Sequence, residues 1–289
     1  MRCLEPLLKQ TGVKLVYRID GQLGECKHRS KQEIAWALMY ADDIALVTES
    51  MHQMQAAIEL ADKTFAQWGL ELSIKKPKVM GIGVDVSMPI ILDRGQIEAV
   101  NDFRYLGSVS SSDNSMQSEL AARLSKAGAA FYRLNKLWRD AHLARHVKLS
   151  IYKTVVLATL LYGCETWAAS QLQVCSLQTF HMRCLRKICH ISLWQRKTND
   201  EIMALAKVES IATLVRYRRL RWLGHMARMD DSRLPKKLLF GGIEQNSVSV
   251  GRPPKSWQDY VREDLAMLKM PYDWFRVAQK RNSWRSRIQ

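Results

Sequence analysis

The sequence predicts an α+β protein, with short strands and one helix in the first part of the chain and helices in the rest. Up to about residue 112, apolar residues occur in short runs separated by Gly, Pro and Asp, a pattern typical of strands and turns. Beyond that point, apolar residues recur every three or four positions over long stretches, which is typical of amphipathic helices. The pattern of apolar residues therefore changes once along the chain, from one typical of strands and helices together to one typical of helices.

The first part begins with a strand predicted from residue 12 to residue 20. Apolar runs at 34–39 and 44–47 then flank the four residues Tyr40-Ala41-Asp42-Asp43, which predicts a hairpin with carboxylates at its tip. Helical spacing from Met54 to Trp68 predicts a helix that Gly69 ends. Further extended segments are expected at 70–74, 79–82 and 90–92, and a strand or tight hairpin broken by a glycine at 100–109.

The helical part begins with an amphipathic stretch from Met116 to Trp138. Further helices are expected at 147–162, 172–191, 211–229, 256–268 and 272–286, and Thr198 resembles a helix start. Residues 241–254 hold three glycines and two prolines, so a loop or linker is expected there. Trp138, Trp167 and Trp222 are expected in the core rather than as platforms for bases.

The charge of the chain favours a polyanionic partner. Among its 289 residues, 47% are hydrophobic, enough for a core, and 44 Lys and Arg stand against 28 Asp and Glu, a net charge of +16. Between Arg183 and Lys237, 14 basic residues stand against 5 acidic ones. Such an excess is typical of nucleic-acid-binding proteins, and Trp194, Tyr217 and Trp222 could stack on bases. A solvated basic surface is the alternative.

The location of the protein is expected to be intracellular, in the nucleus or the cytoplasm. No apolar run reaches the roughly 18–20 residues of a membrane helix, and the N-terminus lacks the apolar core of a signal peptide. Six cysteines in a chain of this length are no disulfide framework. Buried thiols are expected rather than zinc, because paired Cys-x-x-Cys spacing is missing. The candidates weighed for zinc are Cys164, Cys175, His181, Cys184, Cys189 and His190.

The first candidate catalytic residues are Asp42 and Asp43. Aspartate is a common turn residue, so the pair alone is weak evidence. Charged groups at the tip of a buried hairpin, however, cost free energy unless a cation compensates them. Hard cations such as Mg²⁺ bind carboxylate oxygen, and two such ions assist phosphoryl transfer.

Five motifs in order then resemble the reverse transcriptases of non-LTR (LINE-type) retrotransposons, most closely the RTE-like clade. The first is the Tyr-x-Asp-Asp turn at Tyr40, and the others follow it over nearly the whole chain. The second is the Gly-Leu-x-Leu segment at 69–78, which has Ser73 and Pro77 where the family has Asn and Thr. The third is the Phe-x-Tyr-Leu-Gly hairpin at 103–107, and the fourth is the Leu-Tyr-Gly-Cys-Glu-Thr-Trp motif at 161–167. The fifth is the segment at 220–229, together with Gly-Arg-Pro-Pro at 251–254.

The resemblance implies the C-terminal part of a polymerase palm at 1–112, a helical thumb-like region at 113–190 and a basic helical region at 191–289. It implies Mg²⁺ or Mn²⁺ as cofactor, and an RNA template and a DNA primer as partners. Asp42 matches the aspartate that is the established metal ligand in the family. Asp43 matches its neighbour, which usually contributes less to metal binding. Lys76 matches a lysine near the incoming triphosphate, a candidate general acid. The residues expected to contact nucleic acid are Tyr40, Phe103, Tyr105, Leu106, Gly107, Arg123, Lys126, Arg133 and Lys136.

A two-metal polymerase needs a further aspartate from an earlier strand, and Asp20 is the sole aspartate before Tyr40. It lies in a segment that resembles a different part of the family, so it is not expected to be that ligand. Fingers, the first half of the palm and an endonuclease are expected in a longer polyprotein, and these 289 residues alone are expected to be inactive. The alternatives are a non-catalytic basic module that binds nucleic acid and a domesticated domain kept for protein contacts.

Overall fold

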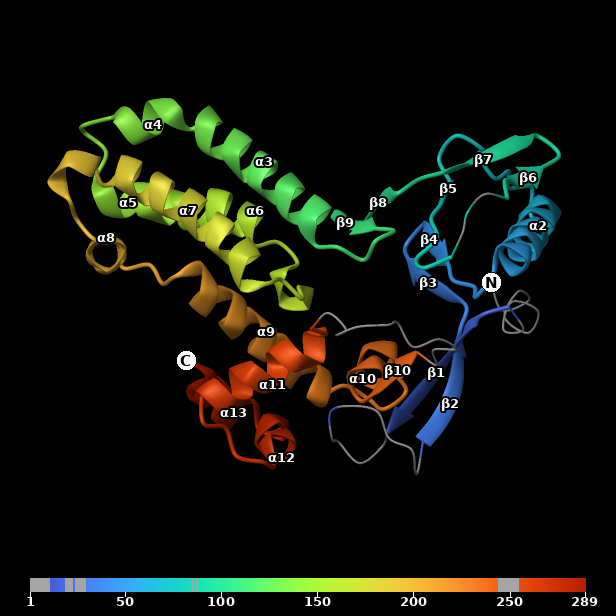
Figure 1. Ribbon diagram of the computed structural model, residues 1–289. Helices are drawn as coiled ribbons and strands as arrows, with labels where there is room; N and C mark the ends of the chain where they lie inside the picture. The colour runs from blue at the N-terminus through green and yellow to red at the C-terminus, as the bar shows by residue number, and fades with distance from the viewer. Residues whose placement is uncertain (1–10, 19–22, 24–29, 85, 87, 244–254) are drawn as a thin grey trace. The chain divides into compact units, whose positions relative to one another are not determined.

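The computed structural model confirms a mixed α+β chain that divides into two compact units (Figure 1). It describes residues 11–18, 23, 30–84, 86, 88–243 and 255–289. Unit 1 comprises Met1–Phe103, Ser111–Asn114 and Met226–Pro254, and unit 2 comprises Arg104–Ser110, Ser115–His225 and Lys255–Gln289. Within the described part of the chain, no helix is both long and apolar enough to cross a membrane. The division at residues 112 and 190 stays a prediction.

Unit 1 contains an antiparallel sheet whose third strand comes from a segment that is distant in the sequence. β1 (Val13–Arg18) lies between β2 (Ser30–Ala35) and β10 (Gly241–Ile243). Just before β10, Lys237 of α10 (Leu234–Leu239) forms an ion pair with Glu33 of β2. The first three residues of the predicted 241–254 loop are therefore a strand, because β1 offers them a free edge. The rest of that loop lies outside the described residues, as do the last two residues of the strand predicted from residue 12 to residue 20.

The predicted first helix is confirmed as α2 (Met51–Gln67). It begins at Ser50, whose side chain accepts a hydrogen bond from the backbone amide of Gln53, an N-cap interaction. Gly69 follows the helix, as expected. One face of the helix packs on the next small sheet, where the side chain of Gln55 donates to the Ile91 carbonyl and accepts from the Ile91 amide.

That next sheet has the order β5 (Lys78–Val79), β7 (Gly95–Ala99), β6 (Ile90–Leu92). The predicted strand at 79–82 is wrong beyond Val79, because the chain bends at 82–84 and leaves the ladder. The central strand β7 was not predicted, because Ile97 is its one large apolar residue. The extended segment predicted at 70–74 forms no strand, since no described neighbour pairs with it.

Helices form the core of unit 2 (Figure 1). The first are α3 (Gln117–Arg133), α4 (Asn135–Arg139), α5 (Arg145–Ile151), the π-helical segment η1 (Tyr152–Leu157), α6 (Ala158–Leu160) and α7 (Gln171–Ile188). The predicted helix at 147–162 thus contains a π-helical stretch. Trp138 and Trp167 are buried as predicted, whereas Trp222 is half-buried.

The cysteines and histidines near α7 mostly lie in this core. Cys164 and Cys184 are buried as predicted, and burial raises the pKa of these thiols to about 11 and about 12. The ring of His181 is fully buried beside the Tyr152 hydroxyl, 2.7 Å from Nδ1, and burial lowers its pKa to about 4. Cys175, by contrast, is exposed, because it lies on the outer face of α7. Among the described residues, no three His, Cys, Asp or Glu side chains are grouped to hold a metal.

The remaining helices of the chain are α8 (Asn199–Ala206), α9 (Ile211–Ala227), α11 (Trp257–Met267), α12 (Trp274–Gln279) and α13 (Arg281–Ile288). Thr198 caps α8 in a reciprocal pair with Glu201, which confirms the predicted start. The single helix predicted at 272–286 is wrong, because extended backbone at Lys280 separates α12 from α13. The break lets Trp284 of α13 pack on α9, where its indole Nε1 donates to the Leu220 carbonyl at 2.9 Å.

Candidate functional site

The two aspartates lie at the tip of a short hairpin, as the sequence predicted. β3 (Ala37–Tyr40) pairs with β4 (Asp43–Leu46), and Tyr40 lies directly opposite Asp43. Ala41 adopts a left-handed backbone with φ of 53°, a conformation common in two-residue hairpin turns. Because side chains alternate along a strand, Tyr40 and Asp43 project from the same face of the hairpin.

The expectation that this hairpin is buried is wrong. Leu38, Met39, Tyr40 and Ile44 are all exposed, Tyr40 to 65%, and since they lie on both faces, neither face of the hairpin is covered near its tip. Only its base is covered, where Leu46 packs near Ala57 of α2. The argument that a buried tip requires a cation therefore does not hold here, and the carboxylates are solvated.

The tip nevertheless suits a hard divalent cation. Within the described part of the chain, neither Asp42 nor Asp43 has a side-chain hydrogen bond or ion pair, so all four carboxylate oxygens are free. Mg²⁺ keeps several of its waters and is commonly bound through one or two carboxylates together with substrate phosphates. Two adjacent aspartates match that donor set, and the described residues bring no third acidic side chain to them.

Lys76, the predicted general acid, is exposed in the irregular segment between α2 and β5. The described residues show no hydrogen bond or ion pair between this lysine and the carboxylates of Asp42 or Asp43. The structure therefore places Lys76 in the same unit as the carboxylate turn without bringing the side chains together. Its role stays a prediction.

The predicted hairpin at 103–107 is confirmed as β8 (Asp102–Tyr105) and β9 (Ser108–Ser111). Its two-residue turn has φ of 48° at Leu106 and 88° at Gly107, the signs of the type I′ turn that suits the twist of hairpin strands. Leu106 at the tip is 41% exposed, and Phe103 and Tyr105 are half-buried.

A buried network in unit 2 holds the tip of this hairpin. Arg123 of α3 is 4% exposed; its Nε donates to Glu119 at 2.6 Å and its Nη2 to the Gly107 carbonyl at 2.6 Å. Glu119 also accepts from the Val109 amide at 2.7 Å. The guanidinium lies 4.6 Å from the ring centre of Tyr162, whose hydroxyl donates to the Leu106 carbonyl at 3.0 Å. The turn is thus fixed from two helical segments.

Arg123, which is expected to contact nucleic acid, is enclosed in this network, and its role toward nucleic acid stays a prediction. Its side chain is 5% exposed, and two of its five donors are directed at Glu119 and the Gly107 carbonyl. Its helical neighbours differ, because Arg133 and Lys136 are exposed. Lys126 is half-buried, and its partial burial, Arg123 and Arg104 lower its pKa. Arg133 and Lys136 are the members of the predicted set best placed for phosphate contacts.

The sequence analysis missed Glu119 and Tyr162 as partners of the hairpin. An acidic and a basic residue four positions apart on one helix are a signal for a pair, but that spacing says nothing about burial. Tyr162 lies in the motif at 161–167, which could have drawn attention to it. Its partner Leu106 is 56 residues away, and such a distance leaves no local pattern.

The motif at 161–167 packs against α9, just before the motif at 220–229 begins. From α9, Arg218 donates to the Leu161 carbonyl at 2.7 Å, and Arg219 to the Trp167 carbonyl at 3.4 Å. Arg219 is also paired at 2.7 Å with Asp264 of α11, and burial raises the pKa of that carboxyl group. Arg218 and Arg219, from the helix expected at 211–229, therefore stabilise the core of unit 2.

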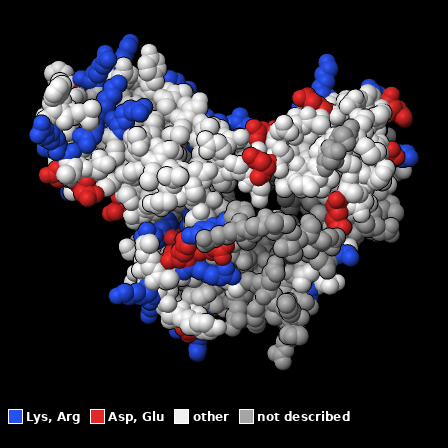
Figure 2. Space-filling model, viewed as in Figure 1, with Lys and Arg blue, Asp and Glu red and all other residues white. Residues whose placement is uncertain are grey.

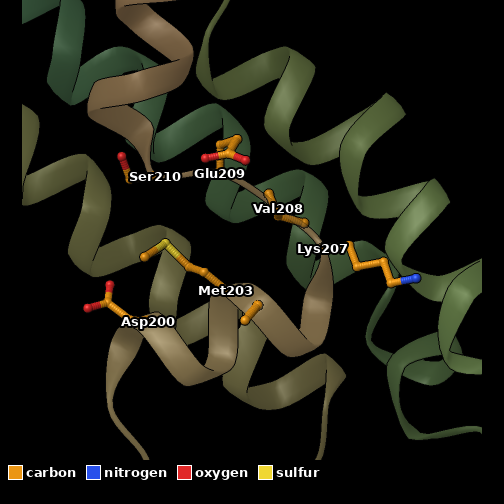
Figure 3. A pocket seen from close by; sticks show the side chains of 7 residues that line it. Asp200, Met203, Lys207, Val208, Glu209 and Ser210 are labelled. Atoms are coloured by element: carbon orange, nitrogen blue, oxygen red, sulfur yellow. The ribbon is translucent and has the colours of Figure 1, made fainter. Parts of the chain in front are cut away.

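A small pocket beside α8 brings no predicted site residue together. It measures about 390 Å³ and is lined by Asp200, Met203, Ala204, Lys207, Val208, Glu209 and Ser210. In Figure 3 the Lys207 side chain points away from the other side chains shown. Lys207 therefore does not converge with the carboxylates of Asp200 and Glu209 in this view.

Comparison with known proteins identifies the chain as a distant relative of a transposon-derived protein. That relative is an uncharacterized protein of Caenorhabditis elegans, 24% identical over 259 residues, which are 86% of this chain and 92% of the relative. No family model and no solved structure matches the chain.

Proposed function

We propose that this chain is the C-terminal part of a non-LTR retrotransposon reverse transcriptase that binds a DNA primer paired with an RNA template. Asp42 and Asp43 contribute to its metal site, and Mg²⁺ bound there would activate the primer hydroxyl and neutralise the leaving pyrophosphate. The single observation that carries the proposal is the hairpin β3–β4, which presents both carboxylates at an exposed turn with no hydrogen bond or ion pair to another described residue. The distant transposon-derived relative supports the same origin.

Other predicted residues have places that agree with this proposal. The hairpin β8–β9 presents Leu106 and Gly107 at a turn held by Arg123 and Tyr162, so it is rigid enough to lie along a primer. Arg133 and Lys136 are exposed near the end of α3 and on α4, where they could contact phosphates of a duplex. In this proposal, unit 1 corresponds to a palm and α3 and α4 to a thumb.

The metal site predicts localised cleavage by iron. Fe²⁺ substituted for Mg²⁺, with ascorbate and peroxide and an RNA–DNA duplex present, is expected to cut the chain near residues 40–44, because reactive oxygen forms at the bound ion. Fragments are mapped by mass spectrometry. Asp42→Asn is expected to abolish the cut, and Asp43→Asn to weaken it. Excess Mg²⁺ is expected to suppress it.

A matched control is Asp93→Asn, which changes an exposed aspartate at the turn between β6 and β7. This variant is expected to cleave like the wild type. Cleavage that ignores Asp42 and Asp43, or that is equally strong at both turns, would remove the support for a metal site at the hairpin tip.

A second candidate, the non-catalytic nucleic-acid-binding module, is favoured by the absence of a third acidic side chain near the turn in the described residues. Because polymerisation uses two metal ions held by several carboxylates, these 289 residues alone are expected to give no Mg²⁺-dependent primer extension on an RNA template. Clear extension by the purified chain, abolished by Asp42→Ala, would overturn this expectation and eliminate the second candidate.

A further inference from the structure

One end of the helical bundle of unit 2 is strongly basic. Two segments build it, residues 133–148 and residues 183–197, and we call them together the bundle end. They contain ten Lys and Arg and a single acidic residue, Asp140. The segments meet because α4 and α5 both contact α7, as Figure 1 shows. In Figure 2, Lys and Arg side chains gather over this part of the surface, and the acidic side chains lie at its margin.

A hollow of about 540 Å³ lies at the bundle end. Its polar and apolar lining includes Arg139, Leu143, Arg145, Lys148, Ile188 and His190. Arg139 and Arg145 are exposed, so their guanidinium groups can change position to contact a bound ligand. The hollow therefore offers several cations on one concave surface.

Lys148 distinguishes this hollow from an ordinary basic surface. The residue is 3% exposed, and its ammonium donates to the carbonyls of Trp138 at 3.1 Å and Asp140 at 2.6 Å. Nε2 of His190 lies 3.4 Å away. Among the described residues no carboxylate neutralises this ammonium. A buried charge without a counter-charge is costly, and a phosphate beside the hollow would supply the missing negative charge.

The bundle end also carries an exposed aromatic side chain. Trp194 is 94% exposed and Leu193 is 77% exposed, although tryptophan is on average a largely buried residue. They lie on the 3₁₀ turn η3 (Leu193–Gln195), which Ser192 caps by accepting from the Trp194 amide at 3.2 Å. Trp194 follows His190 by four residues, so their Cα atoms lie within about 14 Å of each other.

We propose that the bundle end binds a single strand of RNA or DNA, with a phosphate in the hollow and a neighbouring base stacked on Trp194. A duplex keeps its bases stacked inside, so it offers Trp194 no free base face. Stacking platforms beside cationic grooves are the usual means by which proteins hold single strands without reading sequence. An anionic membrane surface would attract the same cations. Segments that lie in a membrane interface, however, carry a broad apolar face. The bundle end instead exposes the two apolar side chains of Leu193 and Trp194 among cations, which favours a nucleic-acid strand.

The test is fluorescence anisotropy of labelled 12-nucleotide strands, oligo-U and oligo-dT, titrated with the full chain at several salt concentrations. Trp194→Ala is expected to weaken binding about 5- to 100-fold, the loss of one stacked base, without changing the salt dependence. Trp194→Phe is expected to retain most of the affinity. Arg139→Ala and Arg145→Ala are each expected to lower the slope of log affinity against log salt by about 0.7, one phosphate contact on a single strand.

Two variants outside the bundle end serve as matched controls. Trp68→Ala removes a tryptophan that is 72% exposed in unit 1, and Lys63→Ala removes an exposed lysine on α2. Both are expected to bind like the wild type. Trp194-dependent binding of either strand supports the proposal, and the tighter strand identifies the ligand.

Three results would overturn the proposal. The first is unchanged affinity of Trp194→Ala, and the second is an equal loss in Trp68→Ala. The third is Trp194-dependent binding of vesicles containing anionic lipid without binding of either strand, which would assign the bundle end to a membrane surface. None of these depends on the carboxylate turn, so the iron cleavage and the strand binding can fail separately.

Discussion

Replacing Glu119 with alanine is expected to lower the free energy of unfolding by about 3–5 kcal/mol, the usual cost of removing one partner of a buried ion pair. Glu119 is 2% exposed and Arg123 is 4% exposed. Without the carboxylate, the guanidinium of Arg123 keeps, among the described residues, the Gly107 carbonyl and the face of the Tyr162 ring. The Val109 amide also loses its acceptor, so the loss combines an uncompensated charge with an unsatisfied donor.

Urea denaturation followed by circular dichroism measures the change, and hydrogen exchange reports on the hairpin. Faster exchange of the amides in β8 and β9 is expected, because the turn is held through this pair. The double variant Glu119→Leu/Arg123→Leu is expected to be less damaging than Glu119→Ala, since apolar replacement of both partners leaves no buried charge. Arg133→Ala, on the exposed part of the same helix, is the control and should stay within about 0.5 kcal/mol. A Glu119→Ala variant as stable as this control would contradict the prediction.

Replacing Gly224 with alanine is expected to destabilise the chain by about 2–4 kcal/mol. An added methyl group would lie 2.2 Å from Nε1 and 2.5 Å from Cδ1 of Trp284. The Trp284 ring is 1% exposed and anchored to the Leu220 carbonyl, so it cannot move without leaving its site. Unpacking a buried tryptophan costs about 3–5 kcal/mol, and the better helix propensity of alanine returns about 1 kcal/mol of this.

The same denaturation experiment with three variants separates the clash from the helix propensity. In a Trp284→Ala background the clash is absent, so Gly224→Ala is expected to stabilise by up to about 1 kcal/mol. Gly128→Ala in α3 is the matched control, because its added methyl group would meet only Phe180 at 4.0 Å, and it should be neutral or stabilising. If Gly224→Ala destabilises equally with and without Trp284, the ring is not the cause.

Local patterns in the sequence were sufficient for the parts of the candidate site that form within a few residues. The hairpin around Asp42 and Asp43 follows from two apolar runs and a turn, and the start of α8 from Thr198 and Glu201. The turn at Leu106 and Gly107 was expected from the glycine and from the resemblance of the motif at 103–107. Each depends on backbone preferences and hydrogen bonds between near neighbours, which short windows of sequence record.

The sequence by itself thus determined the mixed α+β class, the carboxylate turn and most of the helices. Only the tertiary structure decided that Arg123 is buried, that the β3–β4 hairpin is exposed, and that Gly241 to Ile243 complete a sheet begun at Val13. Those outcomes depend on partners between 16 and more than 200 residues apart. Burial and strand pairing arise from contacts of the whole folded chain, and a charge pattern along one helix cannot show which of its cations the fold encloses.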